Sequence, residues 1–136
     1  MLETTTRGEP DFSGVVALIL LQLTDAERAK SVVYLDEQLR PPGQNSIGGH
    51  EYQHNTPCVV AFIDQRPGAN WMHPCRYLLI DPVTSKINSI DSDRPPLFGA
   101  LQPTWRVVWR SHGIDDWRLL PISRPPSEET PKEENV

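Results

Sequence analysis

Residues 24–40, TDAERAKSVVYLDEQLR, decide the expected fold of this chain. Thr24 and Glu27 have the spacing of a capping box, in which each side chain bonds the backbone N–H of the other residue at the start of a helix. The apolar residues that follow form a broad stripe at helical spacing: Ala29, Val32, Val33, Leu35 and Leu39. Because Pro41 and Pro42 cannot continue a helix, the pattern predicts one helix that ends at Arg40.

The run before this segment, VVALILLQL at residues 15–23, is apolar on nearly every side. Such a short run is buried either as a helix or as a strand, and periodicity does not separate the two. It is too short to cross a bilayer, which takes about 20 helical residues. Residues 1–10 also lack the basic region of a secretory signal. We therefore expect a cytoplasmic chain with no membrane partner, whose residues 1–14 form a loose lead-in.

After residue 57 the pattern changes from helical to strand-like. Five segments have the composition of strands: 58–63, 76–80, 87–90, 105–110 and 117–122. The segment 81–86, DPVTSK, is a turn-forming cluster, so the strands on either side of it should pair as a hairpin. The expected fold is α+β, with one or two N-terminal helices packed on a small, mostly antiparallel sheet of four or five strands.

A chain of 136 residues is long enough for one domain, which we place at residues 15–123. Only 38% of the residues are hydrophobic and there are 14 prolines, so the core should be modest and the connections stiff. Residues 41–57 hold few large apolar groups and are predicted to be a long polar loop of the kind that often carries function.

Charge limits the classes of partner. The net charge is −5, and much of the imbalance comes from the last ten residues, where four glutamates face one lysine. Residues 124–136 therefore read as a disordered acidic tail rich in proline and glutamate. A nucleic acid is not the expected partner, because such proteins usually present a basic face. With only two cysteines, the chain has no disulfide framework of the secreted kind.

The string His50-Glu51-Tyr52-Gln53-His54 fits the pattern H-E-x-x-H. On a helix this spacing places both imidazoles on one face, where they bind Zn²⁺, and the glutamate serves as the general base for a metal-bound water. The context opposes this hypothesis, since Gly48-Gly49 precede the string and Pro57 follows it. A polar loop that matches the pattern by chance is the simpler interpretation.

A metal site without a helix is a second hypothesis. His50, His54, Cys58, His73 and Cys75 lie within one short stretch of sequence, and zinc accepts mixed histidine and cysteine ligands. Such a site could order the long loop. Against it, the spacings match no standard zinc module, and a thiol that opens an apolar strand is usually a buried hydrophobe. We expect no cofactor, with zinc as the alternative.

A cysteine hydrolase is a third hypothesis. Cys58, His73 and Asp81 follow one another in the order nucleophile, base and orienting acid, and Asn70 or Asn55 could support an oxyanion. Asp81 also has a simpler explanation as a turn residue before proline. Cys58 lacks the helix N-terminus that typically lowers the pKa of a thiol.

Two further groups are candidates for ligand binding. Alternation along residues 105–110 places Trp105, Val107 and Trp109 on one face of a strand, with Arg106 and Arg110 together on the other. The arginines could clamp an anion, although solvated charge is the simpler interpretation. Large residues in a loop can also mark a binding surface, as Trp71 and Met72 do before the strand at 76–80.

Taken together, the residues favour a small binding or accessory module over an enzyme, acting on a protein partner or a small ligand through residues such as Trp71, Met72, Arg106 and Arg110. The sequence specifies no oligomeric state. The alternative is a zinc-dependent hydrolase with His50 and His54 as ligands, Glu51 as general base and His73 or Cys75 as third ligand. A hydrolase that uses Cys58 and His73 is a further alternative.

Overall fold

The computed structural model describes residues 3–4, 10–69, 72–96 and 100–123. It contains two α-helices, α1 (Ser13–Gln22) and α2 (Asp25–Lys30), and one short 3-10 helix, η1 (Asp116–Arg118). The strands are β1 (Glu3–Thr4), β2 (Pro10–Asp11), β3 (Val32–Arg40), β4 (Gly43–Ile47), β5 (His50–His54), β6 (Cys58–Asp64), β7 (Cys75–Ile80), β8 (Ile87–Ser92) and β9 (Trp105–Arg110).

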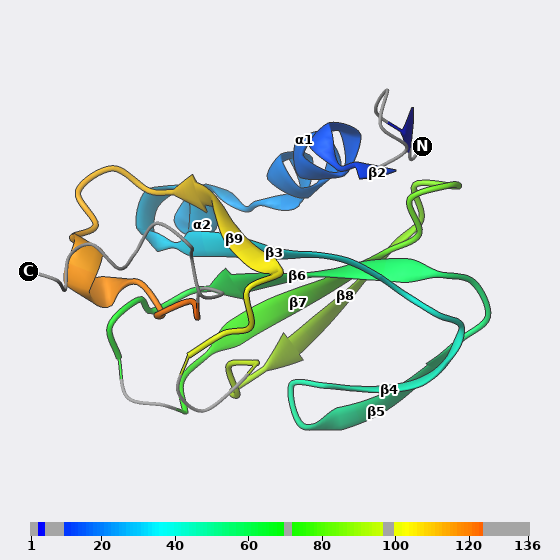
Figure 1. Ribbon diagram of the computed structural model, residues 1–136. Coiled ribbons are helices and arrows are strands. Elements are labelled where there is room, and N and C mark those ends of the chain that lie inside the picture. Colours follow the sequence, from blue (N-terminus) through cyan, green and yellow to red (C-terminus); the bar gives the residue numbers. More distant parts are fainter. Residues whose placement is uncertain (1–2, 5–9, 70–71, 97–99, 124–136) are drawn as a thin grey trace, which may run out of the picture.

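Five strands form one antiparallel sheet in the order β8-β7-β6-β3-β9. Figure 1 shows helix α1 on one side of this sheet and the β4–β5 hairpin on the other. The core is therefore divided in two. A helix-side core contains Val15, Ile19, Val33, Leu35, Ala61 and Ile63, and a hairpin-side core contains Tyr34, Ile47, Phe62, Tyr77, Leu79 and Ile90. The expected α+β class, with N-terminal helices packed on a small antiparallel sheet, is confirmed in this broad form.

The segment 24–40 is half helix and half strand, which corrects the prediction of a single helix. The capping box is present: Glu27 N–H donates to Thr24 Oγ1 at 3.1 Å, and Thr24 N–H donates to Glu27 Oε1 at 2.9 Å. However, α2 ends at Lys30, and β3 begins two residues later. Consecutive residues Val33 and Tyr34 are both fully buried, in opposite cores. Only a strand places neighbouring side chains on two opposite buried faces.

The apolar run before it is a helix. α1 buries Val15 and Ile19 against the sheet, while Leu21 is 75% exposed. Among the described residues, no helix is long and apolar enough to span a bilayer. Within the predicted lead-in, β1 and β2 pair as two short antiparallel strands. The predicted tail at 124–136 lies outside the described residues.

The predicted loop at 41–57 is largely a β-hairpin. β4 and β5 pair in register from Gly43 opposite His54 to Ile47 opposite His50. The turn consists of Gly48 and Gly49, whose φ angles of 58° and 85° suit a two-residue hairpin connection with both φ positive. A side chain at Gly48 would also come within 2.7 Å of the ring of Tyr77. Gly48 therefore allows the hairpin to lie close against the sheet.

Strand β9 has the predicted bounds but carries a bulge. Val33 pairs with Trp109, whereas the next residue, Tyr34, pairs with Val107. The extra residue moves Trp109 to the helix-side core, while Trp105 lies in the hairpin-side core. The predicted common face for Trp105, Val107 and Trp109 is therefore wrong.

The other strand predictions have mixed outcomes. β6 and the β7–β8 hairpin agree with the predicted segments, and the Asp81 carboxylate accepts bonds from the N–H groups of Val83 and Thr84 in the turn. The predicted last strand at 117–122 is wrong. That region contains η1 and a single isolated bridge between Leu101 and Ile122, because Asp116 and Trp117 begin a helical turn instead.

Candidate functional site

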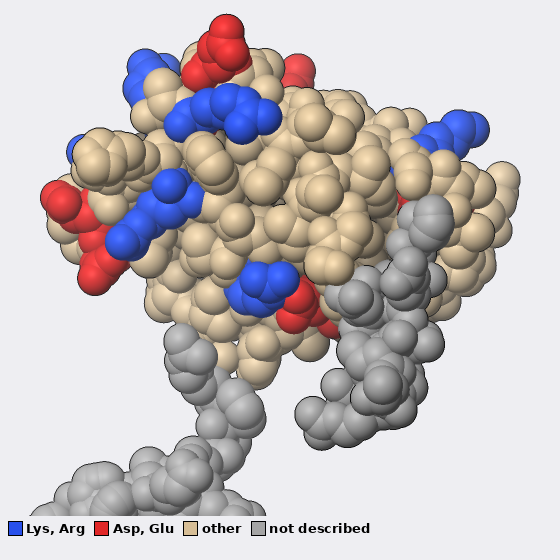
Figure 2. All heavy atoms as spheres, turned by 90° about the horizontal axis from the view of Figure 1, so that it is seen from above, with Lys and Arg blue, Asp and Glu red and all other residues tan. Residues whose placement is uncertain are grey.

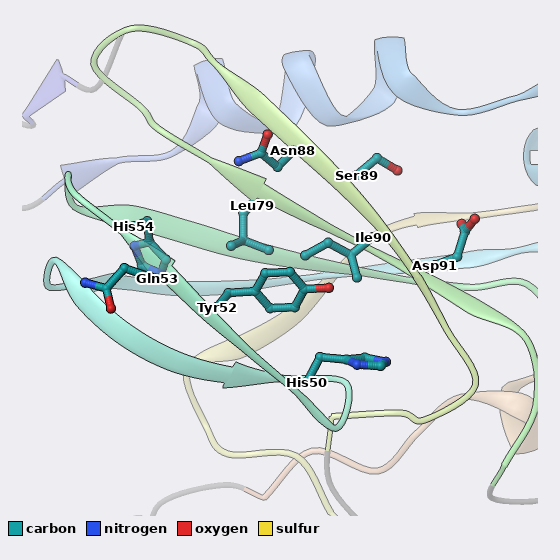
Figure 3. A pocket seen from close by; sticks show the side chains of 9 residues that line it. All are labelled: His50, Tyr52, Gln53, His54, Leu79, Asn88, Ser89, Ile90 and Asp91. Carbon is teal, nitrogen blue, oxygen red and sulfur yellow. The ribbon is translucent and has the colours of Figure 1, made fainter.

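A cleft lies between strand β5 of the hairpin and the edge strand β8 (Figure 3). One hollow in it has a volume of about 500 Å³ and is lined by His50, Tyr52, Gln53, His54, Leu79, Asn88, Ser89, Ile90 and Asp91. A neighbouring hollow of about 610 Å³ continues toward the turn at 81–86 and shares Gln53, His54 and Asn88 with the first. The cleft thus extends along β5, with His54 and Asn88 near its middle.

The hairpin supplies one wall of this cleft. Alternation along β5 places His50, Tyr52 and His54 on one face and Glu51 and Gln53 on the other. Tyr52 and His54 are half-buried, and Tyr52 packs against the hairpin-side core. Figure 3 shows the Tyr52 ring extending toward the sheet residues from β5.

The sheet supplies the floor. Asn88 pairs with Leu79, and Ile90 pairs with Tyr77, so all four side chains point toward the hairpin. Leu79 and Ile90 are buried and apolar, whereas the Asn88 side chain is exposed. Ser92 Oγ donates a hydrogen bond to the carbonyl of Gly48 at 2.9 Å, which ties the end of β8 to the hairpin turn. The register of the sheet and this bond together set the geometry of the cleft.

His54 makes several polar contacts in the cleft. One ring nitrogen, Nε2, lies 3.1 Å from Asn45 Nδ2 on the neighbouring strand. Cys58 Sγ lies 3.5 Å from both ring nitrogens, beside a small hollow of about 70 Å³. Because the sulfur is equally far from both nitrogens, it does not lie along the lone pair of either one. Burial raises the pKa of the Cys58 thiol, so this geometry does not favour a thiolate nucleophile.

The structure does not bring Cys58 and His73 together. Cys58 opens β6, opposite Arg40, whereas Asp64 at the other end of β6 pairs with Cys75. His73 Nε2 lies 2.8 Å from Asp64 Oδ1, and both side chains are buried. The proposed nucleophile and base of the cysteine hydrolase therefore lie at opposite ends of one strand.

The other residues of that hypothesis do not complete the site, although Asp81 lines the same small hollow as Cys58. Asp81 accepts a hydrogen bond from Thr56 Oγ1 at 2.9 Å and belongs to the hairpin turn. Asn55 is exposed, and Asn70 lies outside the described residues. Of the proposed nucleophile, base and orienting acid, Cys58 and Asp81 lie beside one hollow, whereas His73 lies at the far end of β6.

The HEYQH string forms β5 and is not helical. In a strand, the backbones of His50 and His54 are separated by about 13 Å, since each residue advances the chain by about 3.3 Å. Side chains on one face of a strand project roughly parallel to one another, so the two imidazoles stay much farther apart than ligands of one zinc ion, which binds nitrogen at about 2 Å. Glu51 points to the opposite face. The helical geometry that the zinc hydrolase requires is absent from the described hairpin.

Cys75, the alternative third ligand, is buried at the start of β7, and its thiol contacts the carbonyl oxygen of Arg94 at 3.5 Å. Burial raises the pKa of the Cys75 thiol to about 12. Within the described part of the chain, no three side chains of His, Cys, Asp or Glu are grouped so that they could hold one metal ion.

We therefore expect the purified, untagged chain to bind no stoichiometric zinc. Elemental analysis and thermal melting in zinc and in chelator would test this, with His50→Ala/His54→Ala as the matched variant. The melting temperature of the natural chain should be the same in both solutions, because the described fold does not depend on a bound metal ion. Near-stoichiometric zinc that disappears in the variant would contradict the expectation and favour the metal-dependent hydrolase.

The predicted anion clamp is not assembled. Arg106 pairs with Leu35 and Arg110 with Val32, and these two partners point to opposite faces of the sheet. Arg106 bonds the carboxylate of Glu37, and Arg110 Nη1 lies 2.6 Å from Asp116 Oδ1. On the face seen in Figure 2, cationic groups are scattered, and several lie next to acidic ones.

The loop candidates are only partly described. Trp71 lies outside the described residues, and Met72 is 51% exposed.

Sequence reasoning missed Tyr52, Asn88 and Ile90 as lining residues of a cleft. Gly48-Gly49 between Ile47 and the alternating residues of β5 is the hairpin signal that could have found one wall.

No protein-family model, no curated protein and no solved structure matches this chain. The functional argument therefore depends on the cleft and its chemistry alone.

Proposed function

We propose that this chain is a binding module and that the cleft between β5 and β8 holds a small ligand. The observation that carries the proposal is the combination of a hollow of about 500 Å³ with an apolar floor at Leu79 and Ile90 and polar groups around it. Small-molecule sites usually have volumes of about 300–1,000 Å³ and a few polar groups over an apolar lining.

The lining suggests the chemistry of the ligand. Tyr52 and His50 present rings whose centroids are 6.3 Å apart, and either ring can pack on a planar group. His54 and Asn88 offer hydrogen-bond donors and acceptors. Lys86 and Asp81 at the far end of the second hollow carry opposite charges. We therefore infer a partly aromatic ligand that is uncharged or zwitterionic.

We favour binding over catalysis because of the burial and orientation of Cys58, the reactive group nearest to His54. The thiol of Cys58 is buried and lies equally far from the two ring nitrogens of His54, not in line with either one. A metal-dependent hydrolase stays an alternative hypothesis that the zinc measurement decides. Cys58 begins β6, whereas Cys75 begins β7 opposite the other end of β6, and both are free. The cytoplasmic location stays a proposal that rests on the small number of cysteines.

A fragment screen followed by NMR would test the cleft. We expect the amide signals that shift on binding of planar polar fragments to cluster at Tyr52, His54, Leu79 and Asn88. Replacing Asn88 by tryptophan should fill the cleft and weaken binding by about tenfold or more, because a ligand must then displace a packed side chain.

Val83→Trp is the matched control, since Val83 is 71% exposed in the turn and does not line either hollow. This variant should bind the fragments as the natural chain does. Shifts that cluster on another face, or equal affinity in the two tryptophan variants, would contradict the proposed site.

A further inference from the structure

Strand β8 is an open edge of the five-stranded sheet. It pairs with β7 from Ile87 opposite Ile80 to Ser92 opposite Cys75, without a register shift. Among the described residues, no strand pairs with its outer side. An edge of this kind presents unpaired N–H and C=O groups that can pair with another strand.

The two edges of the sheet differ in how they are protected. β9, the opposite edge, carries a bulge and two arginines, Arg106 and Arg110, and Pro103 lies just before it. Bulges, charged side chains and proline are the usual means of preventing an edge from pairing. β8, INSIDS, has no lysine, arginine, proline or bulge, and Asp91 is its one charged residue. β8 is therefore the edge that remains able to pair.

The pairing groups of β8 can be assigned from the hairpin. Asp81 N–H donates to Lys86 O at 2.9 Å, so these two residues form a hydrogen-bonded pair next to the turn. Such pairs alternate along an antiparallel ladder, so the backbone groups of Asn88 face β7. The N–H and C=O groups of Ser89 and Asp91 consequently face outward. Residues 88–91 all line the first hollow, although their side chains alternate between the two faces of the sheet. The hollow therefore follows the backbone edge of β8.

We propose that β8 pairs with β8 of a second copy of this chain, antiparallel and about a two-fold axis at Ile90. In this register Ile90 lies opposite Ile90 of the second copy. Ser89 lies opposite Asp91, and Asn88 opposite Ser92, each pair occurring twice. The edge is therefore complementary to itself, with apolar opposite apolar, hydroxyl opposite carboxylate and amide opposite hydroxyl.

The neighbouring symmetric register is less suitable. A two-fold axis at Ser89 would place the apolar Ile90 opposite Asn88 and Ile87 opposite the carboxylate of Asp91. The axis at Ile90 avoids both mismatches. It also joins the outward N–H and C=O groups of Ser89 to those of Asp91, which makes them hydrogen-bonded pairs in the combined sheet.

A second feature near this edge supports a protein partner. The Arg76 guanidinium donates to Ser89 Oγ at 2.8 Å and to the carbonyl oxygen of Gln22 at 2.8 Å, so the end of α1 lies beside β8. Leu21 in that last turn is 75% exposed. An exposed apolar side chain therefore lies in the helix that ends beside this edge of the sheet.

Sedimentation velocity over a range of protein concentrations tests the proposal. The natural chain should show a reversible monomer–dimer equilibrium. Ser89→Asp places two carboxylates opposite each other at both ends of the interface and should raise the dissociation constant by about tenfold. The double variant Ser89→Asp/Asp91→Ser exchanges the two residues and should restore the dissociation constant of the natural chain. If the axis were at Ser89, the double variant would place the new carboxylate at position 89 opposite its copy at the axis. Recovery of the dissociation constant in the double variant is therefore specific to the axis at Ile90.

Thr104→Asp is the matched control, because it adds the same charge at an exposed position beside β9. It should leave the dissociation constant unchanged. A natural chain that is monomeric at every concentration would overturn the proposal, and so would equal dissociation constants for the natural chain and Ser89→Asp, or a double variant as weak as the single one.

Amide hydrogen exchange provides a measurement that needs no variant. The outward N–H groups of Ser89 and Asp91 should exchange more slowly as the protein concentration rises, whereas exchange at Arg106 on the other edge should not change. Exchange at Ser89 and Asp91 that is independent of concentration would also overturn the proposal. Because the first hollow follows the edge of β8, a paired strand would cover the proposed ligand site, so the dimer and a bound ligand exclude each other. Neither experiment involves a ligand, so the two proposals are still tested separately.

Discussion

Replacing Glu27 by alanine is expected to lower the free energy of unfolding by about 3–5 kcal/mol, as found when one partner of a buried ion pair is removed. Glu27 is only 4% exposed. Its two carboxylate oxygens bond Arg76 Nη2 at 2.7 Å and Nε at 2.9 Å. The carboxylate also accepts bonds from Gln65 and from Thr24 N–H in the capping box. Alanine removes all of these bonds and leaves the Arg76 guanidinium inside the protein without its counter-ion.

The acid dependence of stability should change in the same variant. Burial raises the pKa of Glu27, but the bonds from Arg76, Thr24 and Gln65 outweigh this effect and hold the pKa below its usual value. A lowered native pKa contributes stability above the unfolded pKa, and that contribution is lost as the pH falls through the native pKa. Urea denaturation at neutral and at acid pH should therefore show a smaller difference between the variant and the natural chain in acid.

Glu37→Ala is the matched control for this prediction. Glu37 also binds an arginine, Arg106, but both side chains are partly exposed, and such pairs contribute about 0–1 kcal/mol. Equal losses of stability in Glu27→Ala and Glu37→Ala would contradict the role of burial in the argument.

The sequence predicted those parts of the fold that depend on local signals. The capping box at Thr24 and Glu27, the apolar strand β6 and the turn at Asp81 need only nearby residues, and all three were found where predicted. Strand β3 was missed because Val32, Val33 and Leu35 fit a helical stripe as well as a strand. What decides between them is that both faces of the sheet are covered, by α1 and by the hairpin, and this is a property of the whole fold.

The candidate site was harder to predict for a related reason. His50 and His54 were selected for a helical spacing, yet they belong to a strand, where the same spacing separates them. The cleft itself depends on the register that brings Asn88 and Ile90 opposite β5, far away in the sequence. The bulge in β9 likewise places Arg106 and Arg110 on opposite faces of the sheet, and no local pattern in residues 105–110 predicts this bulge.

Replacing Tyr34 by alanine is expected to lower the free energy of unfolding by about 3–5 kcal/mol. Tyr34 is fully buried near the start of β3, and its ring lies 5.8 Å from that of Phe62. Its hydroxyl accepts a hydrogen bond from Leu120 N–H at 2.8 Å, which fastens the segment after η1 to the hairpin-side core. Alanine leaves both a cavity and an unbonded N–H group. Tyr34→Phe keeps the ring and should cost only about 1–2 kcal/mol, the effect of one lost partner.

Leu39→Ala tests whether this segment is the observed strand or the helix that the sequence predicts. In that helix Leu39 belongs to the buried stripe and Tyr34 does not, so Leu39→Ala would be the costly change. In the structure Leu39 is 39% exposed near the end of β3, and its replacement should cost less than about 1 kcal/mol. Urea denaturation of both alanine variants measures the difference directly. A larger loss at Leu39 than at Tyr34 would contradict strand β3, and with it the two-sided burial on which the sheet and the cleft depend.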